Sequence, residues 1–251
     1  MKTSIVLDEK SAVNELQEII AIPSITGTEK ILAADLAKRL EQLGAEDVVL
    51  QEGVDFRANV IATFRGKSSA ELLLFAHIDT VNTGDWEEYW GKSTGSDLRI
   101  NPFGGAEVDG AIWGRGAGDV KGGIATVLQA LALIKKNGLP LEKSVTVVFV
   151  SDEESGEIGM GLSNGMKAAL PIVQKKSQNP TLAIYLEPTD LNIYTAQMGF
   201  QIVDIKITGK TSYFGKPELG IDALKIGHQV LEKLWQHDLE MKKEIEHGLI
   251  G

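Results

Sequence analysis

Strand-length apolar runs are the feature that most constrains the fold of this chain. Residues 71–76, 145–150 and 182–186 are apolar almost throughout, which is typical of strands buried on both faces of a sheet. Two shorter strand-like runs occur at residues 47–51 and 59–64. Strands of this kind fold stably only when other elements cover them, so amphipathic helices are expected between them.

Helical periodicity is present where such helices are needed. Apolar residues recur at helical spacing in four stretches: residues 9–22, 28–44, 121–136 and, as a short helix, 161–170. We expect Gly44 to end the second helix and Pro171 to close the fourth. The alternation of buried strands with these helices predicts an α/β layered domain.

The pattern changes at residues 195–199, where a new unit is expected to begin. Residues 200–208 alternate as a half-buried strand does, and residues 222–236 read as the helix of the same unit. A lone strand and helix rarely bury enough surface to be stable. We therefore expect two domains, residues 1–197 and an incomplete one at residues 198–251.

Composition narrows the functional classes. The chain has 251 residues, a formal charge of −10 and no cysteine. The charge disfavours nucleic acid as a partner, and the lack of cysteine excludes thiolate metal sites and cysteine nucleophiles. No secretory leader is apparent at the N-terminus, and no apolar run approaches the length of a membrane span, so we expect a cytoplasmic protein without a membrane partner.

One histidine and several carboxylates stand where predicted strands end or a glycine-rich turn begins. These residues are His77, Asp79, Asp119, Glu153, Glu154 and Glu187. Ligands of open α/β sheets bind beyond the carboxyl ends of the strands, so the side chains can converge. A single carboxylate there is more often a turn residue or a helix cap. Several together would repel one another, and a divalent cation would relieve that repulsion; this donor set suits Zn²⁺, Co²⁺ or Mn²⁺.

The pair His77 and Asp79 has the spacing that places two side chains on one side of an extended chain. The carboxylate of Asp79 can then accept the imidazole N–H while the other ring nitrogen binds metal. A histidine satisfied by a carboxylate without any metal is the alternative. Asp119 lies among glycines just before the predicted helix at residue 121, and a capping role is its alternative.

Adjacent Glu153 and Glu154 fit the division of labour in a hydrolytic metal site. Such a site needs one carboxylate that binds metal and another that takes a proton from the attacking water. The alternative is a charged turn ahead of Ser155 and Gly156.

Four segments between Phe75 and Pro188 resemble the M20 metallopeptidase family, in particular its acetylornithine deacetylase, succinyl-diaminopimelate desuccinylase and aminoacylase-like members. They read Phe-Ala-His-Ile-Asp-Thr-Val, Gly-Arg-Gly-Ala-Gly-Asp-Val-Lys-Gly-Gly, Ser-Asp-Glu-Glu-Ser-Gly and Leu-Glu-Pro-Thr. The resemblance implies a zinc-exopeptidase-like domain with a central, largely parallel mixed sheet. It also implies the start of a smaller α+β lid or dimerisation domain, and hydrolysis of an amide bond in a small N-acyl amino acid or peptide.

The same resemblance implies a role for each site residue. Two divalent ions would be bound by His77, Asp119, Glu154 and Glu187, with Asp119 bridging them. Zn²⁺ is the preferred ion, and Co²⁺ and Mn²⁺ are the alternatives. Asp79 would orient the histidine, and Glu153 would be the general base.

Two departures from the family pattern concern the second half of the chain. The chain ends before the region that carries the family's downstream metal-binding histidine, and Tyr213 stands where the lid carries a histidine. We therefore expect a truncated member that dimerises through the lid only at full length. A degenerate, non-catalytic scaffold of the same fold is the competing hypothesis.

Overall fold

The computed structural model describes residues 5–53, 55–91, 97–155, 163–177, 180–197, 199 and 203–244. The chain divides into two compact units, Met1–Pro188 and Thr189–Gly251, and each is described by itself. The division falls after Pro188, whereas the sequence pattern placed it after residue 197.

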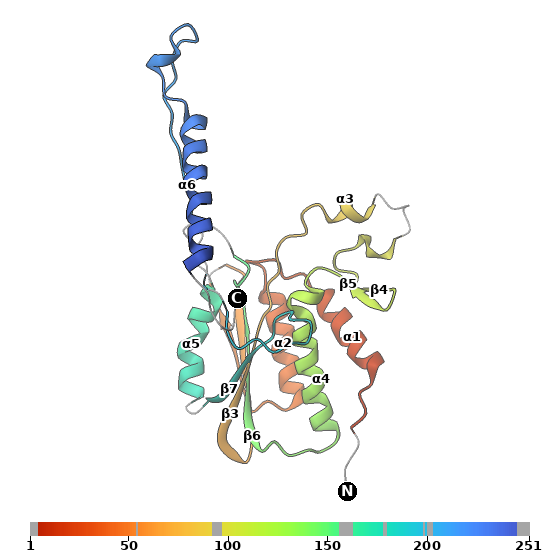
Figure 1. The fold of residues 1–251 in the computed structure, drawn as a ribbon. Helices are drawn as coiled ribbons and strands as arrows, with labels where there is room; N and C mark the ends of the chain where they lie inside the picture. Colours follow the sequence, from red (N-terminus) through yellow and green to blue (C-terminus); the bar gives the residue numbers. More distant parts are fainter. Residues whose placement is uncertain are drawn as a thin grey trace. The chain divides into compact units, whose positions relative to one another are not determined.

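A five-stranded mixed sheet is the centre of the first unit (Figure 1). Its strand order is β1-β2-β6-β3-β7. Its strands are β1 (Asp47–Glu52), β2 (Ala58–Phe64), β3 (Ser68–His77), β6 (Lys143–Val150) and β7 (Pro180–Tyr185). β2 is antiparallel to both its neighbours, while β3 is parallel to β6 and β7. The carboxyl ends of β3, β6 and β7 therefore lie at the same end of the sheet, as the predicted site requires.

Helices cover both faces of this sheet, which confirms the predicted α/β layers. α1 (Glu9–Ile20), α2 (Lys30–Leu43) and α4 (Gly122–Lys136) lie on one face and α5 (Asn164–Lys176) on the other (Figure 1). Alternate strand residues supply the two cores: Val147 and Phe149 of β6 face the three helices, and Val148 and Val150 join the cluster with α5. Gly44 ends α2 in the left-handed conformation, as predicted.

The long segment between β3 and α4 contains several short elements. They are α3 (Trp86–Gly91), a 3₁₀ turn (Leu98–Ile100), the hairpin of β4 (Ala106–Val108) with β5 (Ala111–Trp113), and an irregular helical turn (Ala117–Lys121). Lys121 is 1% exposed, and its Nζ donates to the carbonyl oxygens of Ile19 and Ile22. This contact ties the irregular turn to the end of α1.

The prediction that Pro171 closes a helix is wrong, because Pro171 lies inside α5. A proline in a helix interior removes one backbone hydrogen bond. The apolar side of α5 continues past it, since Ala169 and Val173 are both buried in the second core with Ile172 beside them. Burial of the residues beyond the proline offsets the lost bond.

The expectation that residues 182–186 form a fully buried strand is also wrong. β7 is the outermost strand of the sheet, and Leu182 and Ile184 are 57% and 40% exposed. No other strand pairs with its outer edge in the described part of the chain. The apolar run correctly predicted a strand, but it did not predict that this strand is the outermost one of the sheet.

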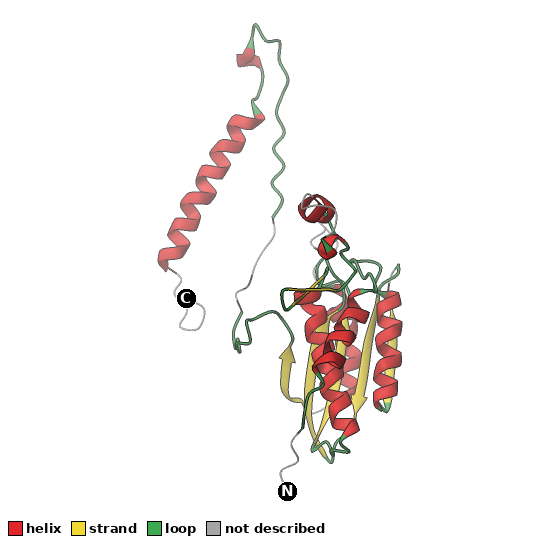
Figure 2. Cartoon of the chain, turned by 90° about the vertical axis from the view of Figure 1, so that its right-hand side faces the viewer, coloured by secondary structure: helices red, strands yellow, loops and turns green. Residues whose placement is uncertain are grey.

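The second unit contains the long helix α6 (Ala223–Glu244) and an extended segment, residues 203–209 (Figure 2). The strand expected at residues 200–208 is not present in residues 203–208, and residues 200–202 lie outside the described residues. The reason is that no strand within the described portion of this unit pairs with the segment. The only ladder contact among the described residues of this unit is an isolated bridge between Lys210, which follows the segment, and Ile221.

The sequence expectation that no stretch approaches membrane-span length needs one correction. Residues Ala117–Lys136 are long and apolar enough by composition to pass such a test. The apolar residues of α4, among them Ile124, Leu128 and Leu131, are buried in the main core. Its composition is therefore accounted for by its place against the sheet.

Candidate metal centre

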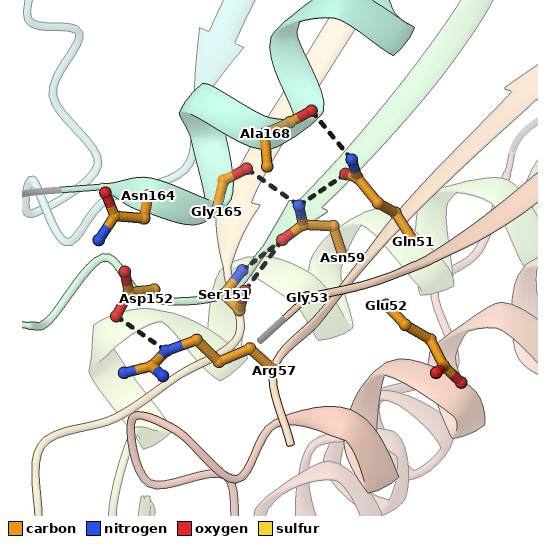
Figure 3. A pocket seen from close by; sticks show the side chains of 10 residues that line it. All are labelled: Gln51, Glu52, Gly53, Arg57, Asn59, Ser151, Asp152, Asn164, Gly165 and Ala168. Atoms are coloured by element: carbon orange, nitrogen blue, oxygen red, sulfur yellow. Dashed lines mark hydrogen bonds and ion pairs between the residues drawn. The ribbon is translucent and has the colours of Figure 1, made fainter. Parts of the chain in front are cut away.

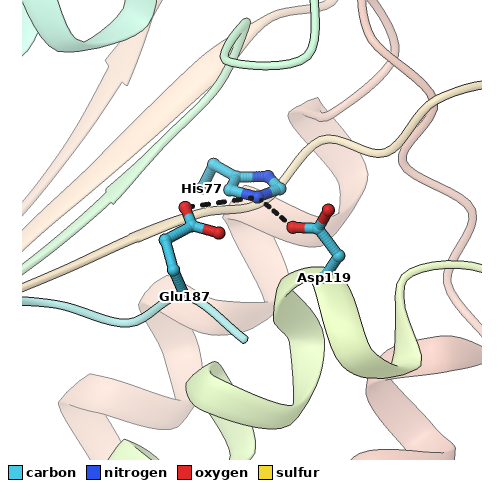
Figure 4. A group of neighbouring side chains, drawn as sticks. All are labelled: His77, Asp119 and Glu187. Carbon is cyan, nitrogen blue, oxygen red and sulfur yellow. Dashed lines mark hydrogen bonds and ion pairs between the residues drawn. The ribbon is translucent and has the colours of Figure 1, made fainter. Parts of the chain in front are cut away.

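His77, Asp119 and Glu187 converge at the carboxyl edge of the sheet (Figure 4). His77 is the last residue of β3, Asp119 lies in the irregular turn before α4, and Glu187 follows β7. One ligand atom from each lies within 4.8 Å of the others. The Nε2 atom of His77 is 2.9 Å from Oδ1 of Asp119 and 3.8 Å from Oε1 of Glu187.

Local structure fixes where these groups stand. His77 is 1% exposed and lies between Ala76 and Ile78, which are both fully buried in the core. The turn that carries Asp119 is tight: Gly116 has a φ of 78°, and a Cβ on Gly122 would lie 2.7 Å from the carbonyl oxygen of Ala117. No side-chain cap bond is found at the start of α4, so Asp119 contacts His77 rather than capping that helix.

Asp79 holds the histidine in a way that differs from the sequence expectation. The Nδ1 atom of His77 is 2.9 Å from the backbone carbonyl oxygen of Asp79 and 3.7 Å from its Oδ1. The predicted bond to the carboxylate is thus replaced by one to the carbonyl. The carboxylate instead accepts bonds from the backbone N–H groups of Glu153 and Glu154 and from the hydroxyl of Thr26. Asp79 therefore connects His77 with the loop after β6.

That loop is also held from behind. Asp152 has a φ of 61°, its backbone N–H donates to Glu29, and its carboxylate accepts from Nε of Arg57 at 3.1 Å. Asp152 and Arg57 line a cavity of about 270 Å³ (Figure 3). Asn59 there bonds to Gln51, Ser151 and Gly165, so the polar lining groups bond mainly to one another. We interpret the residues that line this cavity as structural support for the loop after β6.

The electrostatics of the site reflect crowded acidic groups. Burial first, and then neighbouring carboxylates, raise the pKa of Glu153 and Glu154. The pKa of Glu187 is also raised, again chiefly by burial. Burial would lower the pKa of His77, but Asp79 and Asp119 outweigh it and raise that pKa to about 10. A positive charge at this point is therefore strongly favoured.

The donor set fits a divalent cation. Oε1 of Glu187 is buried and has no hydrogen-bond partner among the described residues, although it faces the ring of His77 (Figure 4). A buried carboxylate oxygen is costly unless something satisfies it, and a metal ion would do so. One imidazole nitrogen with carboxylate oxygens suits Zn²⁺, Co²⁺ or Mn²⁺.

Three further predicted site residues, Asp79, Glu153 and Glu154, lie outside this three-residue group. Glu154 stands next to it on the loop, and the charge of Asp119 is the largest contribution after burial to its raised pKa. Tyr213 belongs to the second unit, where its side chain is 66% exposed and packs on Phe214.

A family model described as Peptidase family M20/M25/M40 matches residues 73–245. The chain belongs to this family. Among its relatives, acetylornithine deacetylase of Pasteurella multocida (strain Pm70) is 29% identical over 229 residues, which cover 90% of this chain and 54% of the relative. Carboxypeptidase G2 of Pseudomonas sp. (strain RS-16) is 30% identical over 86% of this chain and 49% of its own length. The chain thus spans about half the length of the curated relatives it matches.

Two solved structures share the fold of this chain. An M20 family metallo-carboxypeptidase from Sulfolobus solfataricus aligns with a TM-score of 0.56 at 23% identity, covering 72% of this chain and 37% of that one. Aminopeptidase PepT from Bacillus cereus ATCC 10987 aligns with a TM-score of 0.58 at 20% identity, covering 90% and 57%. These likenesses confirm the predicted zinc-exopeptidase-like layers.

Sequence reasoning missed the residues behind the loop, namely Thr26, Glu29 and Arg57. Glu29 directly precedes α2, yet it makes no side-chain cap bond there and is fully buried. The sequence gives only a compositional hint of these residues, because the segment directly before α2 is polar. Nothing in that run shows that it folds against the loop after β6.

Proposed function

We propose that this M20 family member hydrolyses an amide bond in a small N-acyl amino acid or peptide, in a metal-dependent reaction with Glu153 as general base. The observation that supports it most is the group of His77, Asp119 and Glu187, with a buried Glu187 oxygen that lacks a partner. Members of this family hydrolyse peptide and amide bonds, which agrees with the proposed reaction.

Each residue of the site has a defined task in this proposal. His77, Asp119 and Glu187 would hold one divalent ion, preferably Zn²⁺, and Glu154 with Asp119 would hold a second. Bound there, the ions would supply Lewis-acid activation of the water and of the scissile carbonyl. Glu153 would take the proton of the attacking water and deliver it to the nitrogen of the leaving amine. Asp79 would set the ring of His77 and the loop that carries the two glutamates.

The decisive experiment uses the whole protein and the Glu153→Gln variant. Metal is removed with a chelator and Zn²⁺, Co²⁺ or Mn²⁺ is returned, while release of amino acid from N-acyl substrates is followed. We expect activity only with metal, and a loss of about 10²- to 10⁴-fold in kcat for Glu153→Gln with unchanged metal content. Glu46→Gln, which removes an equal charge 59% exposed at the surface, should change neither.

Two outcomes would contradict the proposal. Full turnover by Glu153→Gln with metal present would remove Glu153 as the base. A metal-loaded whole protein that releases nothing from any N-acyl amino acid or peptide would instead favour a non-catalytic role for the fold.

A further inference from the structure

A second cavity, open to solvent, lies between the loop of residues 81–85 and helix α3. Its volume is about 550 Å³, which is within the range of small-molecule sites. Three aromatic side chains of α3, Trp86, Tyr89 and Trp90, form part of the lining, and Arg115 is the only cationic residue among the described residues that line it. The cavity thus combines aromatic surface with one guanidinium.

Arg115 differs from the other four arginines of the chain in having no acidic partner. Arg39, Arg57, Arg65 and Arg99 each form an ion pair with at least one carboxylate. Among the described residues Arg115 forms none, although Asp85 lines the same cavity, and its Nε atom is buried without a hydrogen-bond partner. In a chain of formal charge −10, an unpaired arginine is available for an anionic ligand.

The position of Arg115 is fixed by its surroundings. Its backbone N–H donates to the carbonyl oxygen of Pro102 at 2.6 Å, and its guanidinium carbon lies 5.1 Å from the ring centroid of Trp86. The indole N–H of Trp86 donates in turn to the carbonyl oxygen of Arg99. The guanidinium is planar by delocalisation, and its coplanar N–H donors have the geometry that binds a carboxylate through two parallel bonds.

The cavity and the metal centre are built on the same two segments. Val81 in the cavity wall comes two residues after Asp79, and Arg115 precedes Asp119 by four. The segments touch, since a Cβ on Gly116 would lie 2.6 Å from Cγ2 of Thr80. The residues that line the cavity and those of the metal centre therefore lie on adjoining stretches of the same two segments.

We propose that Arg115, stacked on Trp86, binds a carboxylate of the substrate, and that the aromatic side chains of the cavity contact the apolar group next to that carboxylate. The catalytic part of this inference rests on the proposed amide hydrolysis, whereas binding to the cavity does not. The carboxylate belongs either to the amino-acid half or to the acyl half of the substrate, and both present the same anion to Arg115.

Binding is tested first, without turnover. Tryptophan fluorescence of the whole protein is titrated with 3-phenylpropionate and with its neutral amide, 3-phenylpropionamide. We expect Arg115→Gln to weaken binding of the carboxylate about 10- to 100-fold, as for a lost hydrogen-bonded charge pair, and to leave the amide within about 2-fold. Arg65→Gln removes the same charge from a 60% exposed side chain and should change neither.

Kinetics then separates the two halves of the substrate. N-benzoylglycine and N-benzoylglycinamide differ by a carboxylate in the amino-acid half, while N-succinylglycinamide and N-acetylglycinamide differ by one in the acyl half. Arg115→Gln should raise KM about 10- to 100-fold for the charged member of one pair, with kcat within about 3-fold, and Arg115→Lys should recover part of that loss. The affected pair identifies the half that carries the carboxylate.

The inference is overturned if Arg115→Gln weakens charged and neutral probes equally, or if it behaves as Arg65→Gln does. Trp86→Leu is the second variant: it removes an aromatic contact to both probes and also the ring that positions Arg115, so it should weaken 3-phenylpropionate more than its amide while metal content stays unchanged. A whole protein that binds the carboxylate through Arg115 but hydrolyses nothing would sink the proposed function and leave the cavity assignment standing.

Discussion

The two units of the chain treat their apolar helix residues in opposite ways. In the first unit, Leu36 and Leu40 of α2 are fully buried against the sheet. In the second, Leu224 and Trp235 of α6 are 86% and 60% exposed, and neither core cluster includes a described residue of that unit. An apolar stripe at helical spacing therefore becomes a core only where another layer covers it. The metal centre stands on the unit that has such a core.

The difference between the two units should be largest for metal binding and activity, and one histidine from each unit tests it. His77 is buried at the metal centre, whereas His228 of α6 is 67% exposed beside Glu232. In the whole protein we expect His77→Ala to lower bound metal and to reduce activity by at least about 100-fold, because a ligand is lost. Metal analysis and an N-acyl amino acid assay measure both. Equal losses from His228→Ala would break the comparison.

Stability should differ next, through two matched leucines. Leu36→Ala leaves a cavity in a close-packed core and should lower the free energy of unfolding by about 2–5 kcal/mol. Leu234→Ala removes a side chain that is 45% exposed and should cost less than about 1 kcal/mol. Chemical denaturation of the whole protein measures both variants. A cost of several kcal/mol at Leu234 would mean that a surface absent from this structure covers α6.

Ion pairs provide a smaller contrast. Arg57→Gln strips a partner from Asp152, whose side chain is 2% exposed, and should cost about 3 kcal/mol because a buried carboxylate loses its charged donor. Lys242→Gln breaks a pair with Asp238 on α6 in which both side chains are more than half exposed, and should cost at most about 0.5 kcal/mol. Denaturation curves at low and high salt measure both. Similar costs for the two variants would contradict the assigned difference in burial.

Glycine substitutions should give the smallest effects, of opposite sign. Gly44→Ala forces a side chain into the left-handed conformation that ends α2, where φ is 103°, and should destabilise the first unit by about 1 kcal/mol. Gly227→Ala removes a flexible residue from α6, where a Cβ would meet Ile207 at an ordinary 3.4 Å, and should stabilise that helix by up to about 1 kcal/mol. Hydrogen exchange of each helix detects these changes. Destabilisation at Gly227 would show that α6 is packed more tightly there than the contact indicates.

Sequence patterns predicted the elements of the first unit and its site well, for local reasons. Apolar runs and helical spacing located every strand of the main sheet and the helices α1, α2, α4 and α5, because each pattern reflects which sides of one element are covered. The three residues of the metal cluster were named because each directly follows a strand or precedes a helix. The predictions for Pro171 and for residues 200–208 were wrong for the complementary reason. Packing of α5 outweighs the local effect of Pro171, and residues 203–208 have no partner strand among the described residues.

The sequence by itself determined the layered α/β unit, the family and the set of acidic groups with one histidine. The tertiary structure alone decided that β7 lies at the sheet edge, that the carbonyl of Asp79 holds His77, and that Glu29 and Arg57 support the loop after β6. It also left Arg115 as the arginine without an acidic partner in the described part of the chain. Periodicity records how one element meets its surroundings, whereas these contacts join residues far apart in the chain and arise only when the layers pack together.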